Sequence, residues 1–125
     1  MRKFSRSFRW ACDGLWYTIR TQRNMRIHIL ISAVVILLGF ALGISRVEWA
    51  LIFLTISLVM VAEIINTAFE KVVDMITEEF HPLARIVKNS AAGAVLLAAL
   101  CAVIIGSIIF GPYLIGLLHS RGGLN

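Results

Sequence analysis

Residues 47–74 of this 125-residue chain read VEWALIFLTISLVMVAEIINTAFEKVVD, and this stretch decides the fold. Its first part, residues 47–69, is long and apolar enough to cross a bilayer as a helix, which takes ~20 residues. The stretch also carries Glu63 and Asn66, followed by Glu70 and Asp74. Because a charged side chain in the centre of a bilayer costs ~2.5 kcal/mol or more, each such residue calls for an explanation.

These four polar residues, which we call the polar stripe, share one face of the predicted helix. At about 100° per residue, Asn66 lies at about 300° from Glu63, and Glu70 at about 340°. Asp74 follows at about 20°, so the stripe extends over ~16 Å at ~1.5 Å per residue. It is expected to run from the inner leaflet to the cytoplasmic surface. This geometry suits a site that contacts both a membrane-dissolved and a water-soluble substrate.

Two further apolar stretches, residues 27–44 and 91–118, meet the same length criterion. Hydrophobic residues make up 59% of the chain and the mean hydropathy is +0.87, far above the values of a soluble globule. We therefore predict an all-α integral membrane protein, a single membrane domain over residues 1–125 with three transmembrane helices. These helices are expected at residues 27–44, 47–69 and 91–118, the first two forming an antiparallel hairpin.

Residues 1–26 are predicted to form an amphipathic helix that lies on the membrane surface. Phe4, Phe8 and Leu15 fall on one side of a helical wheel, and arginines gather on the opposite side. Trp10 lies on the flank, where an aromatic ring favours the level of the lipid headgroups. Such a helix is either a simple anchor or one wall of an interfacial active site.

Lysine and arginine residues concentrate on one side of the predicted spans. Seven precede the first span and three lie between the second and third, namely Arg2, Lys3, Arg6, Arg9, Arg20, Arg23, Arg26, Lys71, Arg85 and Lys88. The positive-inside rule places the N-terminus and the segment 71–90 in the cytoplasm, and the C-terminus outside. The net charge of +5 indicates attraction to anionic lipid, and no motif points to nucleic acid as a partner.

The polar stripe and the following cytoplasmic segment carry the groups that phosphoryl transfer requires. Carboxylates bind hard divalent cations and accept protons from hydroxyls. Lys88 and Asn89 supply a cation and an amide for phosphate oxygens. Neither a Walker A sequence nor a protein-kinase glycine loop is present, so a nucleotide site has to be built differently. Two other interpretations stay open, a polar network that only holds the helices together and a small ion- or proton-conducting oligomer.

Isolated polar residues and glycines give weaker signals. His28 and His81 are expected to be interfacial or capping residues rather than metal ligands, because no second His or Cys lies at ligand spacing. Pro112 is expected to end or kink the third helix. Gly39 and Gly43 form a G-x-x-x-G pattern, which fits either oligomerisation or packing within the chain.

Three segments of the chain carry a distinctive pattern, namely EIINTAFEKVVD at 63–74, HPLA at 81–84 and KNSAAGAVL at 88–96. They resemble the prokaryotic diacylglycerol kinase family. Together with RNMRIH at 23–28, the second segment is more similar to the undecaprenol kinase branch. The resemblance implies a homotrimer in the plasma membrane of a bacterium. It also implies cytoplasmic active sites that use ATP and Mg²⁺ to phosphorylate a lipid hydroxyl, that of undecaprenol in the first place and that of diacylglycerol as the alternative.

Carried over by position, the resemblance implies a role for individual residues. Glu63 is the implied general base, with Asn66 and Lys88 as catalytic partners, Lys88 contacting the nucleotide phosphates. Glu70 and Gln22 are the implied metal ligands. The other residues implied to lie around the nucleotide are Trp10, Asp74, Glu79, His81 and Asn89.

Two of these positions depart from the family pattern. Gln22 stands where the family commonly has a glutamate that shares the metal, and Asn89 stands where it commonly has an aspartate. Both changes keep an oxygen but remove a negative charge, which weakens metal binding or shifts the groups around the metal. The departures open a third alternative, a catalytically impaired kinase relative that acts as a binding subunit.

Overall fold

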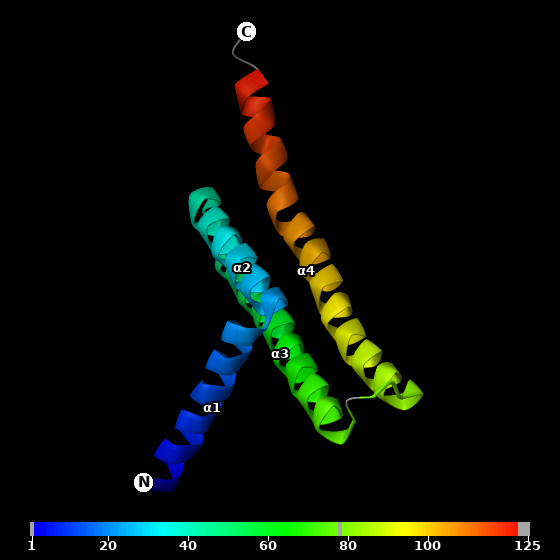
Figure 1. Cartoon of the computed structure of the whole chain (residues 1–125). Coiled ribbons are helices and arrows are strands. Elements are labelled where there is room, and N and C mark those ends of the chain that lie inside the picture. Colours follow the sequence, from blue (N-terminus) through cyan, green and yellow to red (C-terminus); the bar gives the residue numbers. More distant parts are fainter. Residues whose placement is uncertain (1, 78, 123–125) are drawn as a thin grey trace.

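The computed structural model describes residues 2–77 and 79–122, which form four helices and no strand (Figure 1). The helices are α1 (Arg2–Thr21), α2 (Arg23–Leu42), α3 (Arg46–Ile76) and α4 (Pro82–Gly122). By length and composition, α2, α3 and most of α4 are able to cross a membrane. The predicted all-α membrane architecture is thereby confirmed.

Helix α3 is the centre of the arrangement. Helix α4 packs along α3, and α2 runs antiparallel to α3 on another side (Figure 1). Helix α1 contacts the rest near its C-terminal end, where Thr18 is buried, and its N-terminal end projects away. The last turns of α3, the first turns of α4 and the start of α2 therefore lie toward the same end of the molecule.

The turn between α2 and α3 is short because both helix ends are capped. Gly43 adopts φ +65°, a left-handed conformation that glycine tolerates best, and the backbone N–H groups of Gly43 and Ile44 close the end of α2. Ser45 then begins α3 with a capping box, in which its hydroxyl accepts from the Glu48 N–H at 3.3 Å and the Glu48 carboxylate accepts from the Ser45 N–H at 2.7 Å.

Close packing at this end of the bundle explains the G-x-x-x-G pattern within the chain. A Cβ placed on Gly39 would lie 2.9 Å from the ring of Trp49, so only glycine lets α2 approach α3 this closely. Gly43 is the helix cap. A cluster of Ile44, Ile52 and neighbouring apolar residues of α4 completes the contact.

The prediction of one surface helix over residues 1–26 is wrong, because the structure divides this segment at Gln22. Gln22 has extended backbone angles (φ −95°, ψ 119°) between the end of α1 and the start of α2. No glycine or proline marks this break in the sequence. In the extended conformation the Gln22 side chain reaches α3, a tertiary contact that a local pattern does not encode.

Helices α3 and α4 continue beyond the apolar segments expected to span the membrane. Helix α3 extends to Ile76, seven residues past 69, and α4 begins at Pro82, where the missing N–H of proline suits the first helical position. The expectation for Pro112 is wrong in part, because Pro112 lies inside α4 and does not end it. Polar residues outside the apolar segments are thus also held on rigid helices.

Candidate functional site

Glu63 is the most buried large side chain of the described residues, with 1% of its surface exposed. Its Oε2 atom has no hydrogen-bond partner in the described part of the chain. One turn later, the Thr67 hydroxyl donates to the backbone carbonyl of Glu63 at 2.8 Å and so satisfies its own helix rather than the carboxylate. A buried carboxylate oxygen without a partner is costly in a folded protein, and this one is therefore available for a ligand.

Two side-chain amides hold Glu70. Asn66 donates from Nδ2 to Glu70 Oε1 at 3.1 Å, and Gln22 donates from Nε2 to Glu70 Oε2 at 3.5 Å. The Oδ1 atom of Asn66 is buried and, within the described residues, has no partner. Within the described residues, the polar stripe thus presents two unpaired acceptor oxygens and one carboxylate held by two amides, all within two turns of α3.

A cavity of about 330 Å³, the Glu63 cavity, collects these groups from three helices. Helix α3 contributes three residues of the polar stripe, α2 contributes its first two turns, and α4 closes the opposite side with small and aliphatic residues. The lining residues are Asn24, Ile27, His28, Glu63, Asn66, Glu70, Ala92, Val95, Leu96 and Ala99. The cavity is therefore polar toward α2 and α3 and apolar toward α4.

A second polar cavity, of about 240 Å³, lies at the connection between α3 and α4, and we call it the turn cavity. Asp74 of the polar stripe lines it, and the Lys88 Nζ lies 2.6 Å from Asp74 Oδ1. Lys71 approaches the other carboxylate oxygen at 3.7 Å. The turn cavity is lined by Val73, Asp74, Thr77, Glu79, Phe80, His81, Ala84, Arg85, Lys88 and Asn89.

The residues singled out from the sequence thus fall into two adjacent groups and one outlier. Glu63, Asn66 and Glu70 share the Glu63 cavity, with Gln22 in contact with Glu70. The turn cavity brings together Asp74, Glu79, His81, Lys88 and Asn89. Trp10 lies on α1 with 67% of its surface exposed and lines neither cavity.

The sequence of this chain matches a known protein family. The family model described as prokaryotic diacylglycerol kinase matches residues 9–110, which include most of α1, all of α2 and α3, and α4 as far as Phe110, with the residues of both cavities. The chain belongs to the prokaryotic diacylglycerol kinase family. The resemblance found in the sequence motifs is therefore confirmed.

Individual relatives of this kinase carry two different names. It is 43% identical over 114 residues to the undecaprenol kinase of Bacillus subtilis (strain 168), which covers 91% of this chain and 93% of that protein. It is 45% identical over 113 residues to a diacylglycerol kinase of Synechocystis sp., covering 90% of this chain and 65% of that longer protein. The diacylglycerol kinase of Escherichia coli (strain K12) is 33% identical over 89 residues, or 71% and 70% of the two chains.

These relatives make the chain a membrane lipid kinase and favour neither of the other interpretations. An ion-conducting oligomer needs membrane carboxylates but has no use for the turn cavity with its lysine. A merely structural network usually satisfies its buried acceptors, whereas among the described residues Glu63 and Asn66 each have one without a partner.

The donor set of the Glu63 cavity fits a divalent cation that arrives together with a nucleotide. Among the described residues no group of three or more His, Cys, Asp or Glu side chains is placed to hold a metal by itself. Mg²⁺ commonly takes only one or two protein carboxylates and completes its shell with phosphate and water oxygens. Glu70, with Asn66 Oδ1 nearby and unpaired, suits that mode of binding.

Three further residues of this kinase line the cavities although the sequence did not single them out as site residues. Asn24 and His28 lie four residues apart on α2 and both line the Glu63 cavity. Their i, i+4 spacing at the start of an apolar helix was the available signal. The expectation that His28 is an interfacial or capping residue rather than a metal ligand stays a prediction. Arg85 lines the turn cavity one turn before Lys88.

Proposed function

We propose that this kinase transfers the γ-phosphoryl group of ATP, bound with Mg²⁺, to the terminal hydroxyl of undecaprenol. The observation that carries the proposal is the buried Glu63 carboxylate, whose Oε2 has no hydrogen-bond partner among the described residues. Glu63 lines a cavity between helices able to span a membrane. A lipid hydroxyl is the kind of group that such an oxygen accepts a hydrogen bond from.

Glu63 is the proposed general base. The lipid hydroxyl donates its hydrogen bond to Glu63 Oε2, and its oxygen attacks the γ-phosphorus as the proton passes to the carboxylate. The bond from the γ-phosphorus to the β-phosphate oxygen breaks, so the products are the lipid phosphate and ADP. Burial keeps water away from the carboxylate and so favours transfer to the lipid rather than hydrolysis.

The proposed metal site lies beside Glu63 on the polar stripe. Glu70 and Gln22 are the proposed metal ligands, and the ion, when bound, neutralises the charge that develops on the phosphates. Asn66 holds Glu70 in place through its amide. For Gln22 to contribute an oxygen, its amide has to turn by half a rotation, because Nε2 now faces Glu70.

The turn cavity is the proposed nucleotide site. Lys88, which lines this cavity with its Nζ 2.6 Å from Asp74 Oδ1, is assigned to the phosphates. Glu79, His81 and Asn89 provide acceptors and donors for the rest of the nucleotide. Trp10 stays a proposed contact that requires α1 to approach this end of the molecule.

Diacylglycerol is the second candidate substrate. Undecaprenol is preferred because the Bacillus subtilis relative matches over nearly its whole length, at 93%. The diacylglycerol kinase of Synechocystis sp. is similar at the same level of identity over a smaller share of its length. Both lipids offer a primary hydroxyl on an apolar body, so the chemistry at Glu63 is the same for either.

Assembly and orientation complete the proposal. We propose a homotrimer in a bacterial plasma membrane, with the N-terminus and both cavities on the cytoplasmic side. The arginines of α1 and the basic residues around the turn cavity lie toward one end of the bundle, which supports that orientation. Large apolar side chains of α3 and α4 are exposed, for example Leu54 and Ile104, and these faces are available to lipid or to other subunits.

A lipid panel tests the proposed function. The purified chain in nanodiscs receives γ-labelled ATP, Mg²⁺ and either undecaprenol, diacylglycerol or no lipid, and labelled products are separated by chromatography. We expect undecaprenyl phosphate, less or no phosphatidic acid, and no transfer after chelation of the metal. Absence of any phosphorylated lipid, from protein that still binds ATP, would contradict the proposal. Preferential phosphorylation of diacylglycerol would establish the second candidate instead.

A further inference from the structure

An apolar groove of about 570 Å³, the long groove, is formed by α2, α3 and α4. On α4 its lining extends from Ala99 to Leu114, which is ~22 Å of helix at ~1.5 Å per residue. That length covers most of the ~30 Å hydrocarbon core of a bilayer. The long groove is therefore long enough to hold a hydrocarbon chain parallel to the helices.

The long groove adjoins the Glu63 cavity. His28 of α2 and Ala99 of α4 line both. Glu63 itself is 1% exposed and lines the Glu63 cavity, and its Oε2 has no hydrogen-bond partner in the part of the chain that the structure describes. A lipid whose hydroxyl approaches Glu63 thus has the groove directly beside it for the carbon atoms that follow the hydroxyl.

The three hydroxyl groups among the described lining residues of the long groove already donate hydrogen bonds within the protein, so they need no polar partner on a bound molecule. Ser32 donates to the His28 carbonyl at 2.7 Å, Thr55 to the Leu51 carbonyl at 2.6 Å, and Ser107 to the carbonyl of its own preceding turn. Each hydroxyl is satisfied by its own helix. An occupant without polar groups, such as a hydrocarbon chain, therefore leaves no lining hydroxyl unpaired.

Small residues of α4 leave space in the long groove. Ala102, Gly106 and Gly111 line it on α4, and a Cβ placed on either glycine would meet no atom within 4 Å. We propose that the long groove binds the isoprenoid chain of the substrate lipid and that Gly106 is a specificity-determining residue, because its missing side chain admits the methyl-branched units. The inference rests on the proposed function, since it takes the substrate to be a polyprenol.

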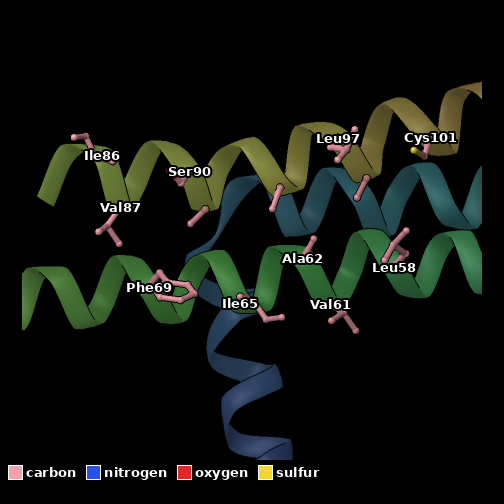
Figure 2. A pocket seen from close by; sticks show the side chains of 13 residues that line it. Leu58, Val61, Ala62, Ile65, Phe69, Ile86, Val87, Ser90, Leu97 and Cys101 are labelled. Carbon is pink, nitrogen blue, oxygen red and sulfur yellow. The ribbon is translucent and has the colours of Figure 1, made fainter. Parts of the chain in front are cut away.

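A second apolar groove, of about 660 Å³, lies between α3 and α4 and does not compete for this role. Figure 2 shows its lining side chains, with Leu58, Ile65 and Phe69 on α3 and Leu97 and Cys101 on α4. None of its lining residues also lines the Glu63 cavity. A lipid chain in this second groove would leave its hydroxyl away from Glu63.

The variant Gly106→Leu tests the proposal, with Gly116→Leu as the matched control. Gly116 lies on the same helix outside the long groove, and a Cβ there also meets no atom within 4 Å. Phosphorylation of undecaprenol is compared with that of geraniol, a two-isoprene alcohol too short to fill the groove. We expect Gly106→Leu to lower the ratio of kcat/KM for undecaprenol to that for geraniol by about tenfold or more, and Gly116→Leu to change it by less than about twofold.

Two outcomes would overturn the proposal. An unchanged ratio in Gly106→Leu would show that the chain does not pass this residue. An equal loss for both alcohols, with an altered pattern of chemical crosslinks between subunits, would assign the long groove to a second copy of the chain.

Photolabelling tests binding of the lipid chain in the long groove independently of phosphoryl transfer. A polyprenol with a diazirine near its third isoprene unit is added without nucleotide, and we expect labels on α4 between Ala99 and Leu114. Gly106→Leu should reduce this labelling and Gly116→Leu should not. Because labelling requires no phosphoryl transfer, it decides the inference even if the proposed activity fails, and labels confined to the α3–α4 groove would overturn it.

Discussion

Gln22, the extended residue between α1 and α2, donates a hydrogen bond to Glu70 of α3 over 3.5 Å, although the two lie 48 positions apart. This contact joins the end of the surface helix to the polar stripe. It also places an amide, not a carboxylate, beside the proposed metal ligand. The metal requirement of the kinase should therefore depend on this pair.

Gln22→Glu should lower the Mg²⁺ concentration that gives half-maximal activity by about tenfold, because a second carboxylate attracts the ion more strongly. The Mg²⁺ dependence of lipid phosphorylation at saturating ATP measures this effect. Gln22→Ala, which removes the amide without adding charge, should raise the requirement or leave it unchanged. An unaltered Mg²⁺ dependence in Gln22→Glu would exclude residue 22 from the metal site.

Asn89→Asp, combined with Gln22→Glu, tests whether the amides at these two positions lower the kcat of the kinase. If the amides limit turnover, the Gln22→Glu, Asn89→Asp double variant should exceed the unmodified chain in kcat by about tenfold, since it adds a carboxylate beside Glu70 and another in the turn cavity. Equal kcat values would show that the chain works with amides and is not impaired by them. The comparison uses initial rates at a Mg²⁺ concentration that saturates both proteins.

Glu63→Gln should reduce kcat by about 10²- to 10⁴-fold, the range in which a positioned general base acts, because an amide cannot accept the hydroxyl proton. The KM for ATP should change by less than about threefold, as the substitution preserves shape and lies outside the turn cavity. Single-turnover rates and nucleotide-binding titrations measure the two quantities. A variant that retains more than about a tenth of the activity would remove Glu63 from the role of base.

Lys88→Gln should raise the KM for ATP by about tenfold or more, because a phosphate loses its cation. The same variant should change the free energy of unfolding by less than about 1 kcal/mol, since the Lys88–Asp74 pair is 42% and 46% exposed and exposed pairs contribute little. Arg46→Gln, at the first residue of α3, is the charge-matched control. Parallel loss of stability and of ATP affinity would indicate a structural role instead.

Gly39→Ala should lower the free energy of unfolding by about 1–3 kcal/mol, because its Cβ would lie 2.9 Å from the Trp49 ring and force the helices apart. Gly116→Ala should be neutral or stabilising, since nothing lies within 4 Å and alanine favours a helix. Thermal unfolding in the same detergent compares the two variants. Similar melting temperatures would show that α2 and α3 do not pack as described.

Much of the architecture was predictable from local pattern. The apolar lengths predict the spanning helices, because in a bilayer a helix satisfies its backbone groups within the segment. The 100° rotation places Glu63, Asn66 and Glu70 on one face of α3. The capping box of Ser45 and Glu48 that begins α3 was also a local signal, although no prediction was made from it. The expected role of each site residue stays a prediction to be tested by the variants above.

Other features depended on where separate helices meet. The break at Gln22 has no local signal, and the contact of Gln22 with Glu70 joins residues far apart in the chain. The helical pattern treated Asp74 as the end of one stripe, whereas α4 divides that stripe by placing Lys88 against Asp74 in a separate cavity. His28 gained its place in the site because α2 crosses α3 at the level of Glu63.

The sequence by itself therefore determined the helices, their polar face and the family, because periodicity and hydrophobicity act within a single segment. Only the tertiary structure decided which polar atoms remain unpaired, how the stripe divides between two cavities and which apolar groove adjoins Glu63. These properties depend on distances between segments, and packing sets those distances only when all the helices are in place.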